Sequence, residues 1–243
     1  ANVAFPLTIL NAAAADGLQW VTKELTAKLQ AGTALPQAIL ETVRTAVIAT
    51  KSIRFEGNNY SQEWVDEAKR RGLLNLKKTP EALEMLRAPS AQEMLDRLAV
   101  FSPEELEARY HIRLERYVKS MAIEVDTLRQ MIDTSILPTA IQTQAFLADS
   151  VVAAQKANVA APQQGTLTRV TELLQSLYSL RRDLDGVSKR IDAADSELER
   201  AKLFAAEASQ IMLSIRAASD ELESIVPDSL WPLPKYRELV FAY

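Results

Sequence analysis

Along most of the chain, apolar residues recur every three or four positions, the spacing that places them on one face of an α-helix. Residues 8–30 follow this pattern, and Gly32 stands where a helix commonly ends in a left-handed residue. Pro36 suits the first turn of a following helix. The apolar positions of these two predicted helices are Ile9, Ala13, Leu18, Val21, Leu25 and Leu29, then Ile39, Leu40, Val43, Val47 and Ile48.

Residues 53–83 interrupt the helical pattern. The tripeptide "IRF" is short enough to be a strand or an extended crossing. In "EGNN", Gly57 and either following asparagine tolerate a positive φ, so we expect a turn there. Ser61 is a suitable N-cap for a helix bearing Trp64, and Gly72 is expected to end that helix.

Three later helix starts are marked by the capping box, in which a serine hydroxyl and a glutamate carboxylate three residues apart accept the free amide protons of a first turn. The boxes are "SAQE" from Ser90, "SPEE" from Ser102 and "SELE" from Ser196. Thr79 followed by Pro80 is a weaker start signal of the same kind.

The helix that starts at Ser102 is predicted to be long, because no glycine or proline occurs between Pro103 and Pro138. Such a helix would extend for about 50 Å. Pro138 is expected to break it, and a second helix then runs through Ile141, Phe146 and Val151. Residues 158–166 have the composition of a loop. The apolar face of the long helix consists of Tyr110, Leu114, Tyr117, Met121, Val125, Leu128 and Ile132.

Two heptad-like segments follow this loop, and both predict helices that pack with a shallow crossing in a bundle of long antiparallel helices. The second stripe begins with alanines, so its partner should approach closely near Ala201 to Ala208. The stripes can pair within the chain, recruit a foreign helix or form an inter-subunit contact through Leu177 and Leu184. They comprise Leu173, Leu177, Leu180, Leu184, Val187 and Ile191, then Leu198, Ala201, Ala205, Ala208, Met212, Ile215, Ser219, Leu222 and Val226.

Composition supports a mainly α protein, since the 243 residues include only six glycines and are dominated by helix formers. A net charge of −4 gives no electrostatic basis for binding nucleic acid or an anionic membrane, and no apolar run is long enough to span a bilayer. The chain has no cysteine, which fits a reducing, cytoplasmic compartment. Its first residues lack an initiator Met and a basic n-region, so we expect the tail of a longer chain.

The sequence offers no catalytic, cofactor-binding or metal-ligating residue. The one histidine, His111, lies among charged residues of the long helix and is interpreted as a surface residue. No glycine pair forms a nucleotide-binding loop, and the carboxylates stand at helical spacing beside Lys and Arg, as surface ion pairs do. The methionines, interpreted as core filling, are Met85, Met94, Met121, Met131 and Met212.

The interrupted stretch "SIRFEGNNYSQEWVDEAKRRGLLNLKKTPEALEML" resembles the region that follows the catalytic domain in type III glutamine synthetases. The likeness continues through "FSPEELEARYHIRLERYVKSMAIEVDTLRQMIDTSILPTAIQTQ" and "LWPLPKYRELVFAY". The opening "ANVAFPLTILNAAAADGL" is similar to the helix entered after the family's last active-site strand. The resemblance covers the whole chain and is weaker through the heptads.

The resemblance implies an enzyme that uses ATP, with Mg or Mn, to join ammonia to glutamate through a γ-glutamyl phosphate. It also implies a homo-oligomer, a dodecamer of two hexameric rings. The family's catalytic residues all precede this segment, so none is carried over, and the segment alone is expected to be inactive. Residues 1–88 would then be the last helices of the catalytic domain and a junction, and residues 89–243 a helical bundle with a helical hairpin that supports the subunit or an interface.

Two points of function stay open. Shorter synthetases carry a regulatory tyrosine in a comparable neighbourhood, but "GNNYSQEW" around Tyr60 does not match that motif. A free-standing helical adaptor that binds partner helices through its heptad face is the alternative function.

The C-terminal "WPLPKYRELVFAY" contains Pro232 and Pro234 and then an aromatic-rich end. It can dock on another surface as an extended segment or close its own bundle. The aromatic residues concerned are Trp231, Tyr236, Phe241 and Tyr243.

Overall fold

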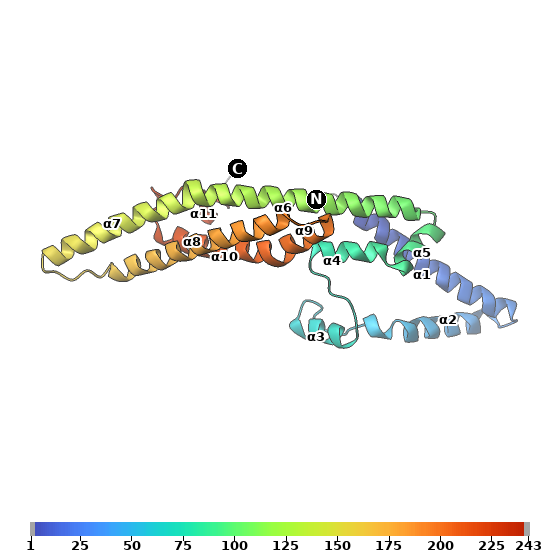
Figure 1. Cartoon of the computed structure of the whole chain (residues 1–243). Helices are drawn as coiled ribbons and strands as arrows, with labels where there is room; N and C mark the ends of the chain where they lie inside the picture. Colours follow the sequence, from blue (N-terminus) through green and yellow to red (C-terminus); the bar gives the residue numbers. More distant parts are fainter. Residues whose placement is uncertain (1–2, 241–243) are drawn as a thin grey trace. The chain divides into compact units, whose positions relative to one another are not determined.

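The computed structural model describes residues 3–240, which form helices joined by turns and loops, with no β-strand in this range. The chain divides into two compact units, of which unit 1 extends to Ile112 and unit 2 begins at Arg113 (Figure 1). The boundary falls within α6 (Pro103–Met131). The mainly α fold predicted from composition is confirmed.

Unit 1 contains two long helices followed by short ones. In chain order its elements are α1 (Ala4–Gln30), α2 (Leu35–Ala49), the 3₁₀ turn η1 (Lys51–Ile53), α3 (Gln62–Arg70), α4 (Thr79–Glu84), the 3₁₀ turn η2 (Met85–Arg87), α5 (Pro89–Arg97) and the start of α6. Helix α1 begins four residues before the predicted position. It ends as predicted at Gly32, whose φ of 83° lets the Thr33 amide reach back to the Lys28 carbonyl.

The core of unit 1 is small and lies where α1 meets α5. Ala12, Leu95 and Leu106 are buried there, with Phe101 and Met94 among the side chains packed around them. The cluster involves only one turn of α1. Most of α1 and all of α2 therefore contribute no large buried side chain to this unit.

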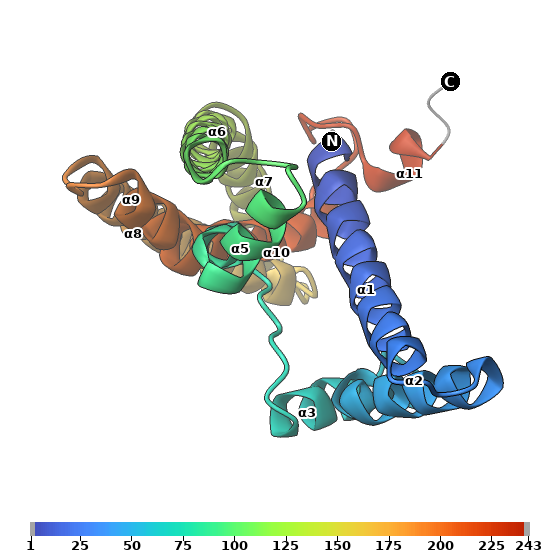
Figure 2. The ribbon, with the colours of Figure 1, turned by 90° about the vertical axis from the view of Figure 1, so that its right-hand side faces the viewer.

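Unit 2 is a bundle of long antiparallel helices. It contains the rest of α6, the π turn η3 (Ile132–Ile136), α7 (Leu137–Lys156), α8 (Gln164–Asp192), α9 (Glu197–Leu203), the π turn η4 (Phe204–Ala208), α10 (Ser209–Ile225) and the short α11 (Tyr236–Leu239). Helix α8 packs along both α7 and α10, and Figure 2 views these helices close to end-on.

The two heptad stripes form the core of this bundle. Leu177, Leu184 and Ile215 are fully buried, and Ala201 and Ala208 are also inaccessible, where the second stripe is small and the helices approach closely. Of the alternatives left open by the sequence, pairing within the chain is therefore the one observed. Leu177 and Leu184, on which the inter-subunit alternative rested, are inaccessible within the single chain and belong to its own core, whereas Met212 of the second stripe is only half-buried.

Pro138 does not break the long helix, contrary to expectation. Helix α6 continues through η3 directly into α7, where Pro138 occupies the first turn. In η3 the Leu137 amide donates to the Ile132 carbonyl, five residues earlier rather than four. This wider turn accommodates the proline ring and its missing N–H, so the helical path continues.

Helix caps were predicted with mixed success. Ser102 and Glu105 form a reciprocal capping box, with N···O distances of 3.0 and 3.2 Å, and the Ser196 hydroxyl caps α9. The "SAQE" prediction is wrong because the N-cap of α5 is Ala88, two residues before Ser90. Pro89 supplies the first-turn φ, which leaves Ser90 inside the helix.

Candidate functional site

His111 lies on the surface of α6, as predicted. Its Nε2 is 3.0 Å from a Glu107 carboxylate oxygen, one helical turn earlier, and its side chain is 65% exposed. This is an ordinary i, i+4 pair on a helix surface.

Tyr110, the neighbour of His111, is buried in a polar contact that the sequence did not reveal. Its hydroxyl donates to the Glu84 carboxylate, and the Arg87 guanidinium lies 5.0 Å from the ring centroid. Burial and the Glu84 carboxylate together raise the pKa of Tyr110 to about 12. The phenol is therefore a permanent hydrogen-bond donor at neutral pH and joins α4 to α6.

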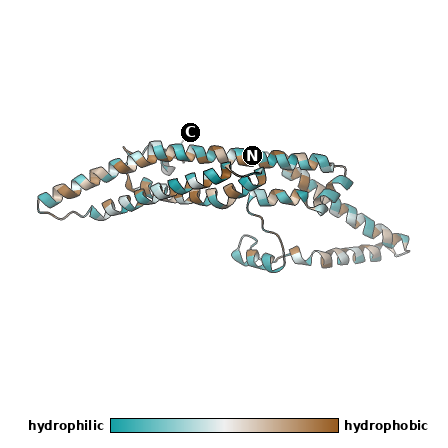
Figure 3. Cartoon of the chain, in the orientation of Figure 1, coloured by the Kyte–Doolittle hydropathy of each residue, from teal (hydrophilic) through white to brown (hydrophobic). Residues whose placement is uncertain are grey.

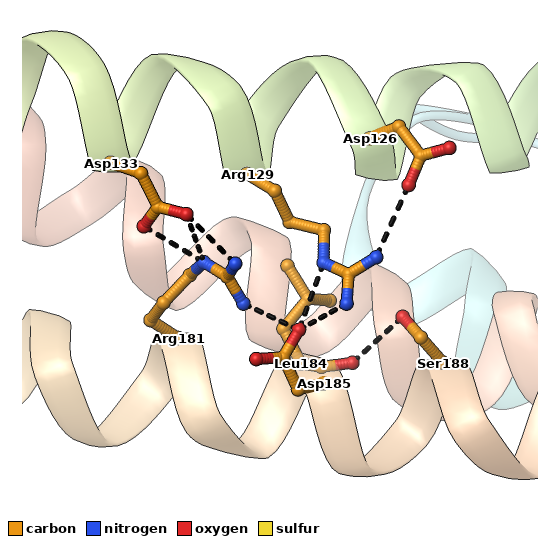
Figure 4. Close-up of polar contacts among 7 residues, drawn as sticks. All are labelled: Asp126, Arg129, Asp133, Arg181, Leu184, Asp185 and Ser188. Atoms are coloured by element: carbon orange, nitrogen blue, oxygen red, sulfur yellow. Dashed lines mark hydrogen bonds and ion pairs between the residues drawn. The ribbon is translucent and has the colours of Figure 1, made fainter.

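A row of alternating charges connects α6 and η3 to α8 in unit 2 (Figure 4). Arg181 binds both oxygens of Asp133 and also lies 2.5 Å from Asp185, as an ion pair rather than an aligned hydrogen bond. Asp185 in turn accepts from Arg129, which reaches Asp126 at 3.2 Å.

This row is electrostatically satisfied. Partial burial alone would raise the pKa of Asp185, but the hydrogen bonds from Arg129 and the ion pair with Arg181 outweigh it and hold that pKa below its ordinary value. Because each carboxylate in the row already faces an arginine, none is poised for acid–base work or free to bind a cation. Within residues 3–240, no three His, Asp or Glu side chains gather in a metal-binding arrangement.

The interrupted stretch of the sequence folds as a small module around Trp64. The Phe55 ring stacks on Trp64 with centroids 4.7 Å apart, and the Arg71 guanidinium lies 5.5 Å from the indole. Arg71 also donates to the carbonyls of Ser52 and Arg54. The module therefore ties residues 52–55 to α3 through ring stacking and hydrogen bonds to the backbone.

Glu67 completes this module by accepting from Arg70 and Arg71 at 2.6 Å. These hydrogen bonds, first from Arg70 and then from Arg71, lower its pKa to about 2. Lys51, Arg54, Arg70 and Arg71 line a surface hollow of about 640 Å³, together with the carboxylates of Glu56 and Glu67.

The turn in this module differs from the expected one. Ile53 ends a 3₁₀ turn and Arg54 is extended, but neither Gly57 nor the following asparagines adopt a positive φ. Gly57 is needed for space instead, because a Cβ there would lie 2.8 Å from the Phe55 ring. Ser61 and Gly72 cap α3 as predicted.

Tyr60 stands at the tip of this turn. Asn58 accepts a hydrogen bond from the Tyr60 amide at 3.0 Å and so fixes the backbone, while the Tyr60 side chain is 98% exposed. The structure thus presents this phenol fully to solvent on an ordered turn.

An apolar groove of about 720 Å³ lies between α6 and α10 in unit 2. Three of the five methionines, Met121, Met131 and Met212, line it together with Leu213 and Leu233. The core-filling interpretation holds for Met94, which packs against the core of unit 1. It is wrong for the three groove residues, which are half-buried because no described helix of unit 2 covers the groove, and for Met85, which is 40% exposed.

The segment before α11 closes its own bundle. Thr139 donates to the Leu230 carbonyl at 3.5 Å, Lys235 donates to the Glu223 carbonyl at 3.1 Å, and Trp231 is half-buried. The predicted contacts of Phe241, Tyr243 and the Tyr236 ring lie outside the described residues.

The contacts missed from the sequence are those between residues distant along the chain. Glu84 and Tyr110, or Arg129 and Asp185, show no local spacing that could pair them. In contrast, the His111–Glu107 and Arg71–Glu67 pairs follow the i, i+4 rule and could have been predicted.

Within residues 3–240, no helix combines the length and apolar character needed to cross a membrane.

Comparison with known proteins accounts for nearly the whole chain. The glutamine synthetase C-terminal domain family matches residues 38–155. The type-3 glutamine synthetase of Dictyostelium discoideum is 31% identical over 247 residues, covering 98% of this chain and 33% of that protein. The glutamine synthetase of Bacteroides fragilis (strain YCH46) is 29% identical, covering 99% of this chain and 34% of that protein.

A third glutamine synthetase, from Butyrivibrio fibrisolvens, is 28% identical and covers 93% of this chain and 33% of its own length. The chain thus spans about a third of the length of the curated relatives that it matches. The chain is thus similar over nearly its whole length to part of these glutamine synthetases, and its residues 38–155 are similar to their C-terminal domain.

Proposed function

We propose that the chain serves as the C-terminal part of a glutamine synthetase, an enzyme that ligates ammonia to glutamate at the expense of ATP. The observation that carries this proposal is the alignment of at least 98% of the chain with glutamine synthetases from two different organisms. The relatives reported above are all named as glutamine synthetases, so no observation favours the adaptor alternative.

The catalytic residues, in this proposal, belong to the two thirds of the enzyme that the chain does not match. The described residues do not fit a Mg or Mn site, because no three metal-binding side chains gather and the carboxylates of the charge row face arginines. ATP and the divalent metal are therefore assigned to the remainder of the enzyme.

The work of this segment is then structural. Residues 1–88 would complete the catalytic domain and carry the chain out of it, and residues 89–243 would form an added helical bundle. The self-contained heptad core of unit 2 supports a rigid bracing element. We further propose a cytoplasmic dodecamer of two hexameric rings, to which this bundle contributes support.

Activity assays of two proteins test the assignment. The full-length polypeptide should release phosphate from ATP only when glutamate and ammonia are both present, whereas purified residues 1–243 should show no γ-glutamyl transfer. Activity of residues 1–243 alone would contradict the structural role. An inactive, folded full-length protein would contradict the enzyme assignment.

A truncation tests the bracing role separately. A full-length polypeptide that stops at Ile112, the end of unit 1, should keep the proposed catalytic residues and the core of unit 1 but lose the assembled dodecamer, which mass photometry would detect. A truncated protein that still assembles and turns over at the full rate would contradict a structural role for the bundle.

A further inference from the structure

Helix α1 carries an apolar stripe that no described part of unit 1 covers. The stripe recurs at spacings of three and four, so its members share one face of the helix. Leu10 is 64% exposed and Leu18 is 70% exposed. Val21 is nine residues from the buried Ala12, about two and a half turns, and so lies on the opposite side of the helix. The stripe consists of Leu7, Leu10, Ala14, Leu18 and Val21, preceded by the exposed N-cap residue Val3.

Helix α2 shows the same arrangement more sharply. Its buried positions are the small residues Ala38 and Thr42, and α2 contacts α1. The larger side chains of α2 are exposed, with Leu40 at 64%, and apolar residues appear in brown along α2 in Figure 3. Val47 is nine residues from Ala38 and therefore opposite to it. The exposed face consists of Ile39, Leu40, Val43 and Val47.

These two faces, which we name the α1–α2 apolar faces, contrast with the helices of unit 2. In α8 the large apolar residues that repeat at helical spacing are buried, whereas in α2 the large apolar residues are exposed. Contiguous exposed apolar surface of this kind marks an interaction surface. A helix whose buried positions are Ala and Thr while Leu, Ile and Val are exposed is built for a partner on its other side.

We propose that the α1–α2 apolar faces pack against the remaining two thirds of the glutamine synthetase polypeptide. This inference rests on the proposed function. The occupant follows from chain length, because the relatives have about three times the length spanned by this chain and the matching family is a C-terminal domain. The faces carry no charged side chain, so they fit an apolar surface of that polypeptide.

Thiol labelling of the full-length protein tests this packing. The chain contains no cysteine, so introduced thiols are the only ones in this segment, and peptide mapping separates them from others. Leu10→Cys and Leu40→Cys probe the two faces. Lys23→Cys on α1 and Thr45→Cys on α2 are matched controls, because both positions are exposed on the other side of the same helices. Circular dichroism verifies that each variant is folded.

We expect the thiols at Leu10→Cys and Leu40→Cys to react with maleimide on the order of tenfold or more slowly than their controls, since reaction depends on access. Equal labelling of face and control thiols would overturn the packing. Protection that disappears on dilution to the free subunit would also overturn it and would indicate a second copy as the occupant.

The labelling result is independent of the activity assay. An active enzyme with evenly labelled thiols refutes the packing and leaves the proposed function intact. An inactive full-length protein with protected thiols supports the packing and refutes the proposed function.

Discussion

At the scale of single residues, Gly57 shows how the absence of a side chain permits a local structure. The Phe55 ring occupies the space in which any Cβ at position 57 would lie. The ring then stacks on Trp64, whose other contact is the Arg71 guanidinium. A residue that sequence patterns mark as a turn former is thus required by packing.

We predict that Gly57→Ala opens the module around Trp64 and destabilises it by about 1–3 kcal/mol, the usual cost of overpacking. Hydrogen exchange of peptides covering residues 55–70 measures this change. Gly17→Ala is the control, because nothing lies within 4 Å of its added methyl and the exposed helix interior should gain up to about 1 kcal/mol. Unchanged exchange in the Gly57→Ala variant would contradict the steric role.

Glu67 gives the same module a dependence on pH. Its pKa is about 2 in the folded state and about 4.5 in the unfolded state. Between these pH values the unfolded chain binds a proton at Glu67 that the folded chain does not, so acid favours unfolding. The contribution of Glu67 to stability is therefore complete above pH 4.5 and is lost as the pH falls towards 2. Carbon NMR of the Glu67 carboxyl should show the lowered midpoint, and Arg70→Ala should move it upward. A midpoint near 4.5 in both proteins would contradict the hydrogen bonds described.

At the scale of elements, two adjacent residues of α8 have different roles, one in the buried core and one in a surface ion pair. Leu184 is fully buried in the bundle, while Asp185 joins the charge row at the surface. We predict that Leu184→Ala lowers the free energy of unfolding by about 2–5 kcal/mol. Asp185→Ala should cost about 1 kcal/mol or less, because partly exposed ion pairs are screened by water.

Chemical denaturation of both variants compares these costs, and the exposed Leu213→Ala is the control. A charge at the same position, in Leu184→Asp, should unfold unit 2 and not merely dissociate an oligomer. Dissociation into folded subunits with intact helicity would show that the stripe faces another subunit.

Elements that depend on contacts between residues close together in the sequence can be predicted from it, whereas those that depend on contacts between distant residues cannot. Heptad stripes, the Ser102 box and the left-handed ends at Gly32 and Gly72 depend on neighbours within a turn or two, so spacing alone predicts them. The π turn before Pro138 has no compositional signature, because it differs from an α-helical turn only in its backbone hydrogen bonding, such as the bond from the Leu137 amide to the Ile132 carbonyl. The charge row joins α6 to α8 and needs the tertiary fold, which sequence spacing does not supply.

At the scale of the whole chain, the two units differ in how much apolar side chain they bury. Buried contacts set the free energy of local opening, so helices without them exchange their amide protons sooner. In residues 1–243 alone, we predict slow exchange in α8 and fast exchange in α2, whose buried residues are only Ala38 and Thr42. Hydrogen exchange with mass spectrometry measures both helices in one sample. Equal protection of α2 and α8 would contradict the difference in burial.

The uncovered faces of α1 and α2 also have a consequence in time. A ribosome synthesises a protein from its N-terminus, and domains fold in that order. Under the proposed packing, the surface that receives α1 and α2 has already left the ribosome when these helices emerge. Their apolar side chains therefore have a surface to pack on as soon as they emerge, and the bundle of unit 2, which buries its own seams, is synthesised afterwards.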